Sequence, residues 1–258
     1  MKFKCAMGMV VFSGCSPPAA PQELNELTGF LFQHAADTEA DHLEQGLINL
    51  RKWMSKRLDE TIDGYVVDNL SGNAVNGLDQ CTREITGLIG AAAGSVSTYS
   101  VEEMVDLRIN GAQMQLYEDL HSYDRDYLLN DTECYRTQTC DMLHYDAYAT
   151  RDFPLGIEVQ AISRVQHRWV ETNEGYANVQ RSWLARPMKA TPDWVNVEEQ
   201  FYLSATIPWE NDGSVRMQAI WAITEFGSAP VPENIALQVA ITQMKDDAET
   251  CEEWLNTH

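Results

Sequence analysis

The chain has 258 residues, of which 44% are hydrophobic and 9% aromatic, a composition typical of a globular protein that can bury a sizeable core. It carries 39 Asp and Glu against 18 Lys and Arg, a formal net charge of −21. Such an acidic surface repels phosphate backbones and anionic headgroups, so we expect no nucleic acid among its partners.

The N-terminus indicates an export signal, because residues 1–14 place two lysines before a short apolar run and small residues. The run is too short to cross a bilayer as a helix, which takes about 20 residues. The stretch "FSGC" and the spacer after it resemble the lipobox of bacterial lipoproteins. The resemblance implies cleavage before Cys15, attachment of lipid to that cysteine and, from Ser16, release to the outer membrane. A plain secretory signal or a buried first strand is the alternative.

We therefore expect a signal peptide over residues 1–14, the lipidated cysteine and a spacer over 15–22, and one α+β domain over 23–258. The chain would then lie at the periplasmic face of the outer membrane or on the cell surface. Its lipidated N-terminus would be its only contact with the membrane.

Export would place the other cysteines in an oxidising compartment, where disulfides persist. In "CYRTQTC", Cys134 and Cys140 are close enough to close a small loop, and we expect a bridge that stabilises the fold by about 2 kcal/mol. Cys81 and Cys251 then form a second pair or stay as two buried thiols. No CxxC or histidine pairing accompanies them, so we expect no zinc site and no other metal or cofactor.

Helical periodicity dominates the first half, with two helices predicted between residues 21 and 56. The small, apolar stretch 81–97 predicts a closely packed helix. Ser100 and Glu103 form a capping box at the start of a further helix. Residues 116–155 have weak periodicity and predict a long irregular segment that carries the small disulfide loop.

The second half predicts an antiparallel sheet. Four segments alternate with period 2, namely 157–171, 176–185, 195–209 and 214–226. The connections "TNEGY" and "ENDGS" predict three-residue loops in which Gly175 and Gly213 take the left-handed conformation. This register sets apolar residues opposite one another, including Trp169 with Val179. It leaves the other face polar and exposed to water.

The C-terminal segment predicts a helix that covers the apolar face of this sheet. Its apolar residues recur at spacings of 4, 3, 4, 3 and 4: Leu237, Ile241, Met244, Ala248, Cys251 and Leu255. The layout over residues 157–258, with helices before it, resembles the helix-grip architecture of START-like lipid-binding domains. The resemblance implies an apolar cavity between sheet and helix. The expected fold class is α+β, a curved antiparallel sheet covered by a long C-terminal helix, with a helical N-terminal part.

The predicted register directs three polar side chains, His167, Arg181 and Glu199, to the inner face, with His167 opposite Arg181. Buried charges must be paired, hydrated or placed beside an open pocket. We therefore expect a ligand-binding site walled by tryptophans, made of His167, Trp169, Arg181, Trp183, Glu199, Leu203 and Trp221. A buried Arg181–Glu199 pair, or strand ends that reach water, is the structural alternative.

The sequence contains no GxSxG, HExxH or phosphate-loop motif, and we expect no catalytic residues. Two acidic clusters, at 37–41 and 124–133, lack the spacing of calcium-binding loops and indicate solvated surface. The sequence thus predicts a cell-envelope lipoprotein that binds an apolar or amphipathic small molecule such as a lipid. The alternatives are a structural or protein-interaction lipoprotein with a filled core, and a hydrolase that uses His167 and Glu199 with a nucleophile that the sequence does not reveal.

Overall fold

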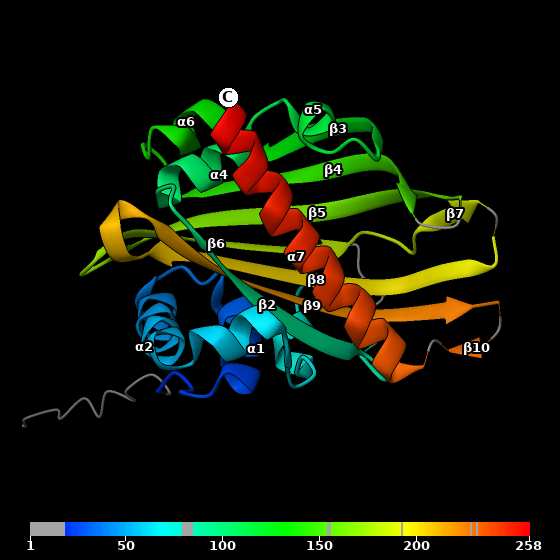
Figure 1. Ribbon diagram of the computed structural model, residues 1–258, viewed down its shortest axis with the longest axis horizontal. Coiled ribbons are helices and arrows are strands. Elements are labelled where there is room, and N and C mark those ends of the chain that lie inside the picture. Colours follow the sequence, from blue (N-terminus) through cyan, green and yellow to red (C-terminus); the bar gives the residue numbers. More distant parts are fainter. Residues whose placement is uncertain (1–18, 79–84, 154–155, 192, 228, 231) are drawn as a thin grey trace, which may run out of the picture.

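The computed structural model describes residues 19–78, 85–153, 156–191, 193–227, 229–230 and 232–258 (Figure 1). The strands are β1 Tyr65–Val66, β2 Ile89–Ser97, β3 Leu120–Leu129, β4 Met142–Phe153, β5 Ile157–Thr172, β6 Gly175–Leu184, β7 Lys189–Thr191, β8 Val195–Pro208, β9 Ser214–Phe226 and β10 Ala229–Pro230. The helices are α1 Leu24–His34, α2 Asp41–Asp63, α3 Gly72–Val75, α4 Val101–Ile109, α5 Gln113–Leu116, α6 Thr132–Arg136 and α7 Glu233–Thr257, with a 3-10 turn, η1, at Glu210–Asp212.

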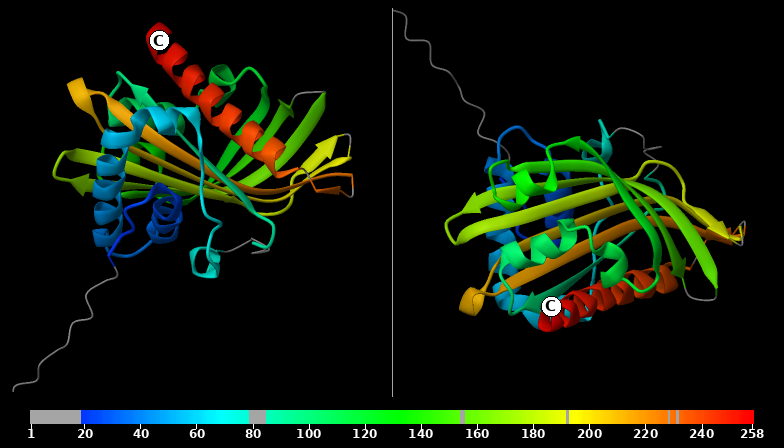
Figure 2. Two further views of the ribbon diagram at one scale, coloured as in Figure 1. Left: turned by 60° about the horizontal axis from the view of Figure 1, so that its bottom comes forward. Right: turned by 90° about the horizontal axis from the view of Figure 1, so that it is seen from above.

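The described strands form one curved antiparallel sheet in the order β1-β2-β9-β8-β6-β5-β4-β3, with β10 beside β9 and β7 beside β5. Helices α1 and α2 pack on its convex face, and α7 crosses its concave face on the same side as α4, α5 and α6 (Figure 2). The predicted α+β class, with a long C-terminal helix laid on a curved antiparallel sheet, is confirmed. No helix among the described residues combines the length and the apolar character needed to span a bilayer.

The register of the first predicted hairpin is wrong by one residue. Thr172 pairs with Gly175, so β5 and β6 are joined by a two-residue turn rather than a three-residue loop. The Thr172 hydroxyl closes the turn by donating to the Gly175 carbonyl at 2.7 Å. Because side chains alternate with period 2, the slip moves Trp169 to the other face of the sheet, opposite Asn178.

The second hairpin is longer than predicted, because Pro208 pairs with Ser214 across residues 209–213. The positive φ values here belong to Asn211 (56°) and Asp212 (61°), whereas Gly213 has φ −82°. The predicted pairing of β8 with β9 is therefore wrong by two residues. A shift of two keeps every side chain on its predicted face.

The apolar face of the sheet is covered by the N-terminal helices, so the prediction that α7 covers it is wrong. Phe201, Leu203 and Trp221 are buried beneath Leu31 and Phe32 of α1. Gly94 of β2 allows α2 to approach, since a Cβ there would lie 2.5 Å from Thr61 Cγ2. This large mixed helix–sheet core supplies most of the hydrophobic burial.

The predicted stripe of α7 faces the sheet, but on its concave side. Met244 and Cys251 are buried, and Met244 packs with Ala91 and Ala93 of β2. The polar face that we expected to be wet is largely enclosed. Its members Asn178, Thr206, Arg216 and Gln218 are buried.

Two further segments differ from their predictions. Residues 89–97 form the strand β2 instead of a helix, because small residues are needed where α2 and α7 approach it from opposite sides. Residues 116–155 form β3, α6 and β4 rather than an irregular segment. The capping box of Ser100 and Glu103 is confirmed at the start of α4.

The predicted Cys134–Cys140 disulfide is present. Cys251 is a buried free thiol. The predicted signal peptide, Cys15 and Cys81 lie outside the described residues.

Candidate functional site

The seven residues predicted to bind a ligand lie on two opposite faces of the sheet. The slip in the first hairpin places His167 and Trp169 on the concave face, with Gln180 and Asn178 as their partners on β6. The other five lie on the convex face: Arg181, Trp183, Glu199, Leu203 and Trp221. They therefore do not form one site.

The convex members belong to the core under α1. Trp221 is fully buried, and its indole N–H donates to the Asp68 carbonyl at 2.9 Å. Leu203 and Trp183 are 0% and 2% exposed in the same cluster. Their surroundings are filled by protein side chains, so they act in packing rather than as the wall of a pocket.

Arg181 binds the end of α1. One guanidinium nitrogen donates to the Phe32 carbonyl at 2.9 Å, and Nε donates to the Gln166 amide oxygen at 2.7 Å. Burial lowers the pKa of Arg181 to about 10, and the nearby charge of Asp37 opposes that shift. A cation at the last carbonyls of a helix satisfies orphan acceptors and complements the helix dipole, which gives Arg181 a structural role.

Glu199 and His167 cannot act together in a hydrolase. Glu199 is buried on the convex face beside a β-bulge in β8, whereas His167 is buried on the concave face. The sheet lies between them, so the two side chains do not meet the same substrate bond.

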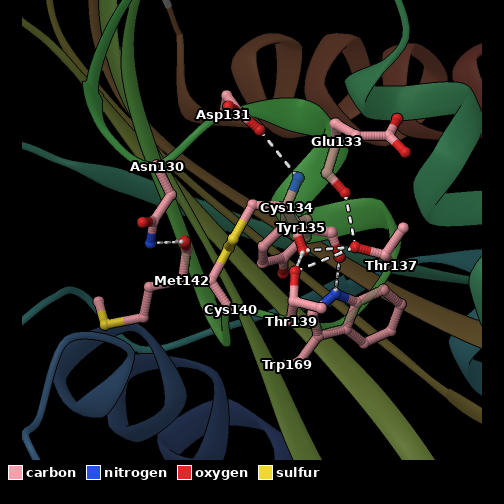
Figure 3. The surroundings of a disulfide bond; sticks show 10 residues. All are labelled: Asn130, Asp131, Glu133, Cys134, Tyr135, Thr137, Thr139, Cys140, Met142 and Trp169. Carbon is pink, nitrogen blue, oxygen red and sulfur yellow. Dashed lines mark hydrogen bonds between the residues drawn. A yellow bond between two sulfur atoms is a disulfide. The ribbon is translucent and has the colours of Figure 1, made fainter.

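His167 and Trp169 belong to an aromatic cluster with Tyr135 and Tyr145. Figure 3 shows Trp169 and Tyr135 of this cluster beside the disulfide. The Trp169 indole N–H donates to the Tyr135 carbonyl at 2.9 Å, and the two rings stack. His167 Nε2 lies 3.2 Å from the Tyr145 hydroxyl. Burial lowers the pKa of His167 to about 3, assisted by the positive charges of Arg125 and Arg108. The imidazole is therefore neutral at physiological pH and packs as part of this cluster.

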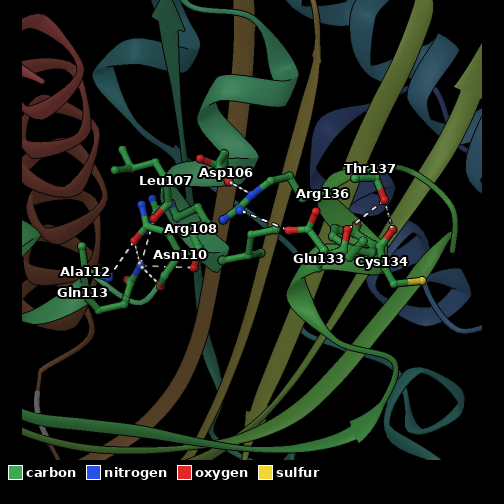
Figure 4. Close-up of polar contacts among 12 residues, drawn as sticks. Asp106, Leu107, Arg108, Asn110, Ala112, Gln113, Glu133, Cys134, Arg136 and Thr137 are labelled. Atoms are coloured by element: carbon green, nitrogen blue, oxygen red, sulfur yellow. Dashed lines mark hydrogen bonds and ion pairs between the residues drawn. The ribbon is translucent and has the colours of Figure 1, made fainter.

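Polar contacts fix the helices around this cluster (Figure 4). Arg136 of α6 pairs with Asp106 of α4, so the disulfide loop is attached to α4. The Gln113 amide donates to the Leu107 carbonyl at 2.9 Å and satisfies the end of α4.

A buried charge network attaches α7 to the sheet. Asp247 accepts hydrogen bonds from Arg108 and from the Tyr117 hydroxyl (2.6 Å), and it pairs with Arg216 at 3.1 Å. Burial alone would raise the pKa of Asp247. The charges of Arg108 and Arg216, with hydrogen bonds from Arg108 and Tyr117, lower it well below its usual range instead. The carboxylate thus stays ionised and holds α4, α5 and α7 around the concave face.

Between α7 and β4, the concave face carries half-buried side chains from the central strands. We call this set the concave surface: Ser163, Gln180, Ser182, Gln200, Tyr202 and Ile220. It is accessible because α7 packs mainly on β2, at one side of the sheet. Sequence reasoning missed these residues because it assigned their face to bulk water.

The concave surface combines two chemistries. Ser163, Ser182 and Gln180 offer hydroxyl and amide groups, whereas Ile220 and the Tyr202 ring offer apolar area. The Gln218 amide nitrogen donates to the Tyr202 hydroxyl at 3.0 Å and also to Asp247. A molecule with both polar and apolar parts fits such a surface better than a purely apolar one.

No family model matches the sequence, and no curated protein matches it. Among solved structures, the chain is similar to a fragment (25–204) of the STAR-related lipid transfer protein from Xanthomonas axonopodis, at 14% identity and a TM-score of 0.45, over 75% of this chain and 92% of that one. It is also similar to a START superfamily protein from Mycobacterium smegmatis (10% identity, TM-score 0.45, 65% and 97% covered) and to Ara h 8.0201 (12%, 0.40, 67% and 100%). Similarity this distant carries no inference about a ligand for this chain.

Proposed function

We propose that the chain is an envelope lipoprotein that binds an amphipathic small molecule, such as a lipid, on its concave surface. The observation that carries the proposal is the set of half-buried polar and apolar side chains on the central strands between α7 and β4. A face that served only in packing would be fully covered. The convex face is fully covered in this way beneath α1 and α2.

The contacts around the concave surface support binding there. The Asp247 network fixes α7 beside it, and the disulfide loop fixes the aromatic cluster of His167 and Trp169 on the same face. A site built on braced strands and helices loses little conformational freedom when a ligand binds, which favours affinity. Apolar contact with Ile220 and Tyr202 would supply most of the binding energy, and the serine and amide groups would set orientation.

The proposed tether rests on the N-terminal sequence. "FSGC" followed by a Pro/Ala spacer fits lipid attachment at Cys15, and the Cys134–Cys140 disulfide fits an oxidising compartment. Expression of the full precursor in a Gram-negative host, followed by mass analysis, tests this part. We expect the wild-type chain to begin at Cys15 with added acyl mass and to sediment with membranes, whereas Cys15→Ala should not carry lipid. An unmodified wild-type chain would refute the tether.

Binding is tested separately with the Cys15→Ala chain, purified without detergent and examined by native mass spectrometry. We expect the Cys15→Ala chain to co-purify with an amphiphile or to bind added lysophospholipid saturably. Ser182→Trp adds bulk to the concave surface and should weaken binding at least tenfold. Ser55→Trp makes the same change at an exposed position of α2 and should leave binding unchanged.

Equal binding by the two tryptophan variants would remove the concave surface as the site. If the chain neither co-purifies with an amphiphile nor binds added lysophospholipid, the result would favour the alternative of a structural or interaction lipoprotein. Circular dichroism of both variants checks that the fold is retained.

A further inference from the structure

Three side chains with metal-binding atoms meet where α1 joins α2. His34 is the last residue of α1, Asp37 lies in the connection, and His42 lies in the first turn of α2. His34 Nδ1 is 2.6 Å and His42 Nδ1 is 3.0 Å from the same atom, Asp37 Oδ2. The three atoms all lie within 4.8 Å of one another. Both imidazoles are thus directed at the same carboxylate oxygen.

We propose that His34, Asp37 and His42 form a binding site for a divalent cation of the Zn²⁺ type. Imidazole nitrogens and a carboxylate oxygen are a ligand set that zinc uses in proteins, and imidazole is a general ligand for first-row divalent metals. A tetrahedral zinc ion about 2.0–2.1 Å from each atom requires ligand atoms roughly 3.3 Å apart. Both imidazole nitrogens are closer than this to Asp37 Oδ2, so a cation would enter with an outward movement of Asp37 and adjustment of the two imidazoles, and it would replace two N–H···O hydrogen bonds.

The neighbours of these residues hold them in place. Arg168 donates to the carbonyls of Asp37 and Thr38, which fixes the connection against β5. The Phe30 ring lies against both imidazoles, with centroids 4.3 Å from His34 and 6.0 Å from His42. Contacts of this kind orient metal ligands and reduce the cost of assembling a site.

The site is accessible to a cation and surrounded by negative charge. The His34, His42 and Asp37 side chains are 11%, 26% and 35% exposed. Asp37 and His42 border a shallow hollow that also includes Glu39 and Asp41. Solvent can therefore reach the point on which the ligands converge and supply a fourth ligand.

A cation here would tie α1 to α2, the two helices that cover the convex core. Such a clamp is independent of the proposed ligand on the concave surface, which lies on the other side of the sheet. The alternative is that the same three side chains hold the helices by hydrogen bonds alone, with no metal.

Competition of the full chain with a chromophoric zinc chelator tests the proposal. We expect one Zn²⁺ per wild-type chain and a rise in the midpoint of thermal unfolding when zinc is added. His42→Gln removes one ligand and should lower the zinc affinity more than tenfold and abolish the thermal shift. His121→Gln is the matched control, because His121 is exposed on β3 and pairs with Asp152 far from this connection.

Asp37→Asn keeps the side-chain volume and provides a second variant in case His42→Gln is poorly folded. Loss of zinc affinity in a folded Asp37→Asn protein supports the site. Failure of the wild-type chain to bind zinc stoichiometrically would overturn the proposal and leave the hydrogen-bonded clamp. Equal affinity in His42→Gln, Asp37→Asn and His121→Gln would overturn it as well, because zinc would then bind elsewhere.

Discussion

Asp247 is the most sharply testable residue of the concave side, because one carboxylate serves two arginines. Asp247 Oδ1 accepts from one Arg108 nitrogen at 2.9 Å, and Oδ2 accepts from the other Arg108 nitrogen and lies 3.1 Å from an Arg216 nitrogen. The Arg216 side chain is 3% exposed, and it also donates a weak hydrogen bond to Cys251 Sγ at 3.9 Å. Replacing Asp247 with Asn keeps the shape but removes the charge that both guanidinium groups face.

The size of the effect follows from burial. Removing one member of a buried ion pair costs about 3–5 kcal/mol, because the remaining charge is left without compensation in a poorly hydrated place. Asp247 and Arg108 retain 19% and 18% exposure, so water screens part of the loss. Asn also keeps hydrogen bonds to Tyr117 or Gln218. We therefore expect the free energy of unfolding to fall by about 3 kcal/mol, at the lower end of this range.

Urea unfolding followed by tryptophan fluorescence measures this change. With a slope of about 3 kcal/mol per molar urea for a chain of this size, the midpoint should fall by about 1 M. Asp246→Asn removes the same charge from an exposed neighbour on α7 and should shift the midpoint by less than 0.2 M, an order-of-magnitude bound for a surface change. A loss below about 1 kcal/mol for Asp247→Asn, or equal losses in both variants, would show that this network does not hold α7 in place.

Three further predictions address the core, the aromatic cluster and the disulfide. Trp221→Ala should cost about 3–5 kcal/mol in urea unfolding and leave ligand binding in place once stability is restored by osmolyte, since Trp221 is core under α1. The folded pKa of His167 is about 3, so below the ordinary histidine pKa the unfolded chain binds a proton that the folded chain does not. As the pH is lowered from about 6 to about 4, the free energy of unfolding of the wild-type chain should therefore fall by up to about 1.4 kcal/mol per pH unit. His167→Gln should lose less over the same range. Cys134→Ser with Cys140→Ser should lower stability by about 2 kcal/mol under non-reducing conditions and match the reduced wild-type chain.

The strands of the second half could be predicted because their alternation is strong, but the register of the first hairpin could not. Pairing apolar with apolar residues favoured Trp169 opposite Val179 and hence a three-residue loop. In the structure Trp169 lies opposite Asn178, and both contact Tyr135 from the disulfide loop. A third partner from a distant segment made the polar pairing favourable, and two strand sequences alone do not contain that information.

The choice of cover for the apolar face failed for a related reason. The chain has two sets of amphipathic helices and a sheet with two faces to bury, and the sequence shows the stripes without showing which face each one covers. The position of α7 directly after the last long strand in the sequence favoured α7 as the cover of the apolar face. In the structure, α1 and α2 carry the larger apolar side chains that pack with Phe201 and Trp221. The cluster of His34, Asp37 and His42 was missed because residues 37–41 were interpreted as solvated acidic surface, and the two histidines meet Asp37 across a helix connection.

The two covers differ in how completely they bury the sheet, and this difference supports a binding role for the concave side. In β8, Phe201 and Leu203 face α1 and are fully buried, while Tyr202, on the other face, is only half-buried although α4 and α7 lie on that side. Polar side chains on a concave face need partners, and the Asp247 network satisfies Gln218 but extends only to the part of the face near α7. The remaining hydroxyl and amide groups are stabilised by water or by a ligand that replaces it, because leaving them buried without hydrogen bonds costs about 1–3 kcal/mol each. A bound molecule must therefore bring hydrogen-bonding groups of its own, which favours an amphipathic ligand over a simple hydrocarbon.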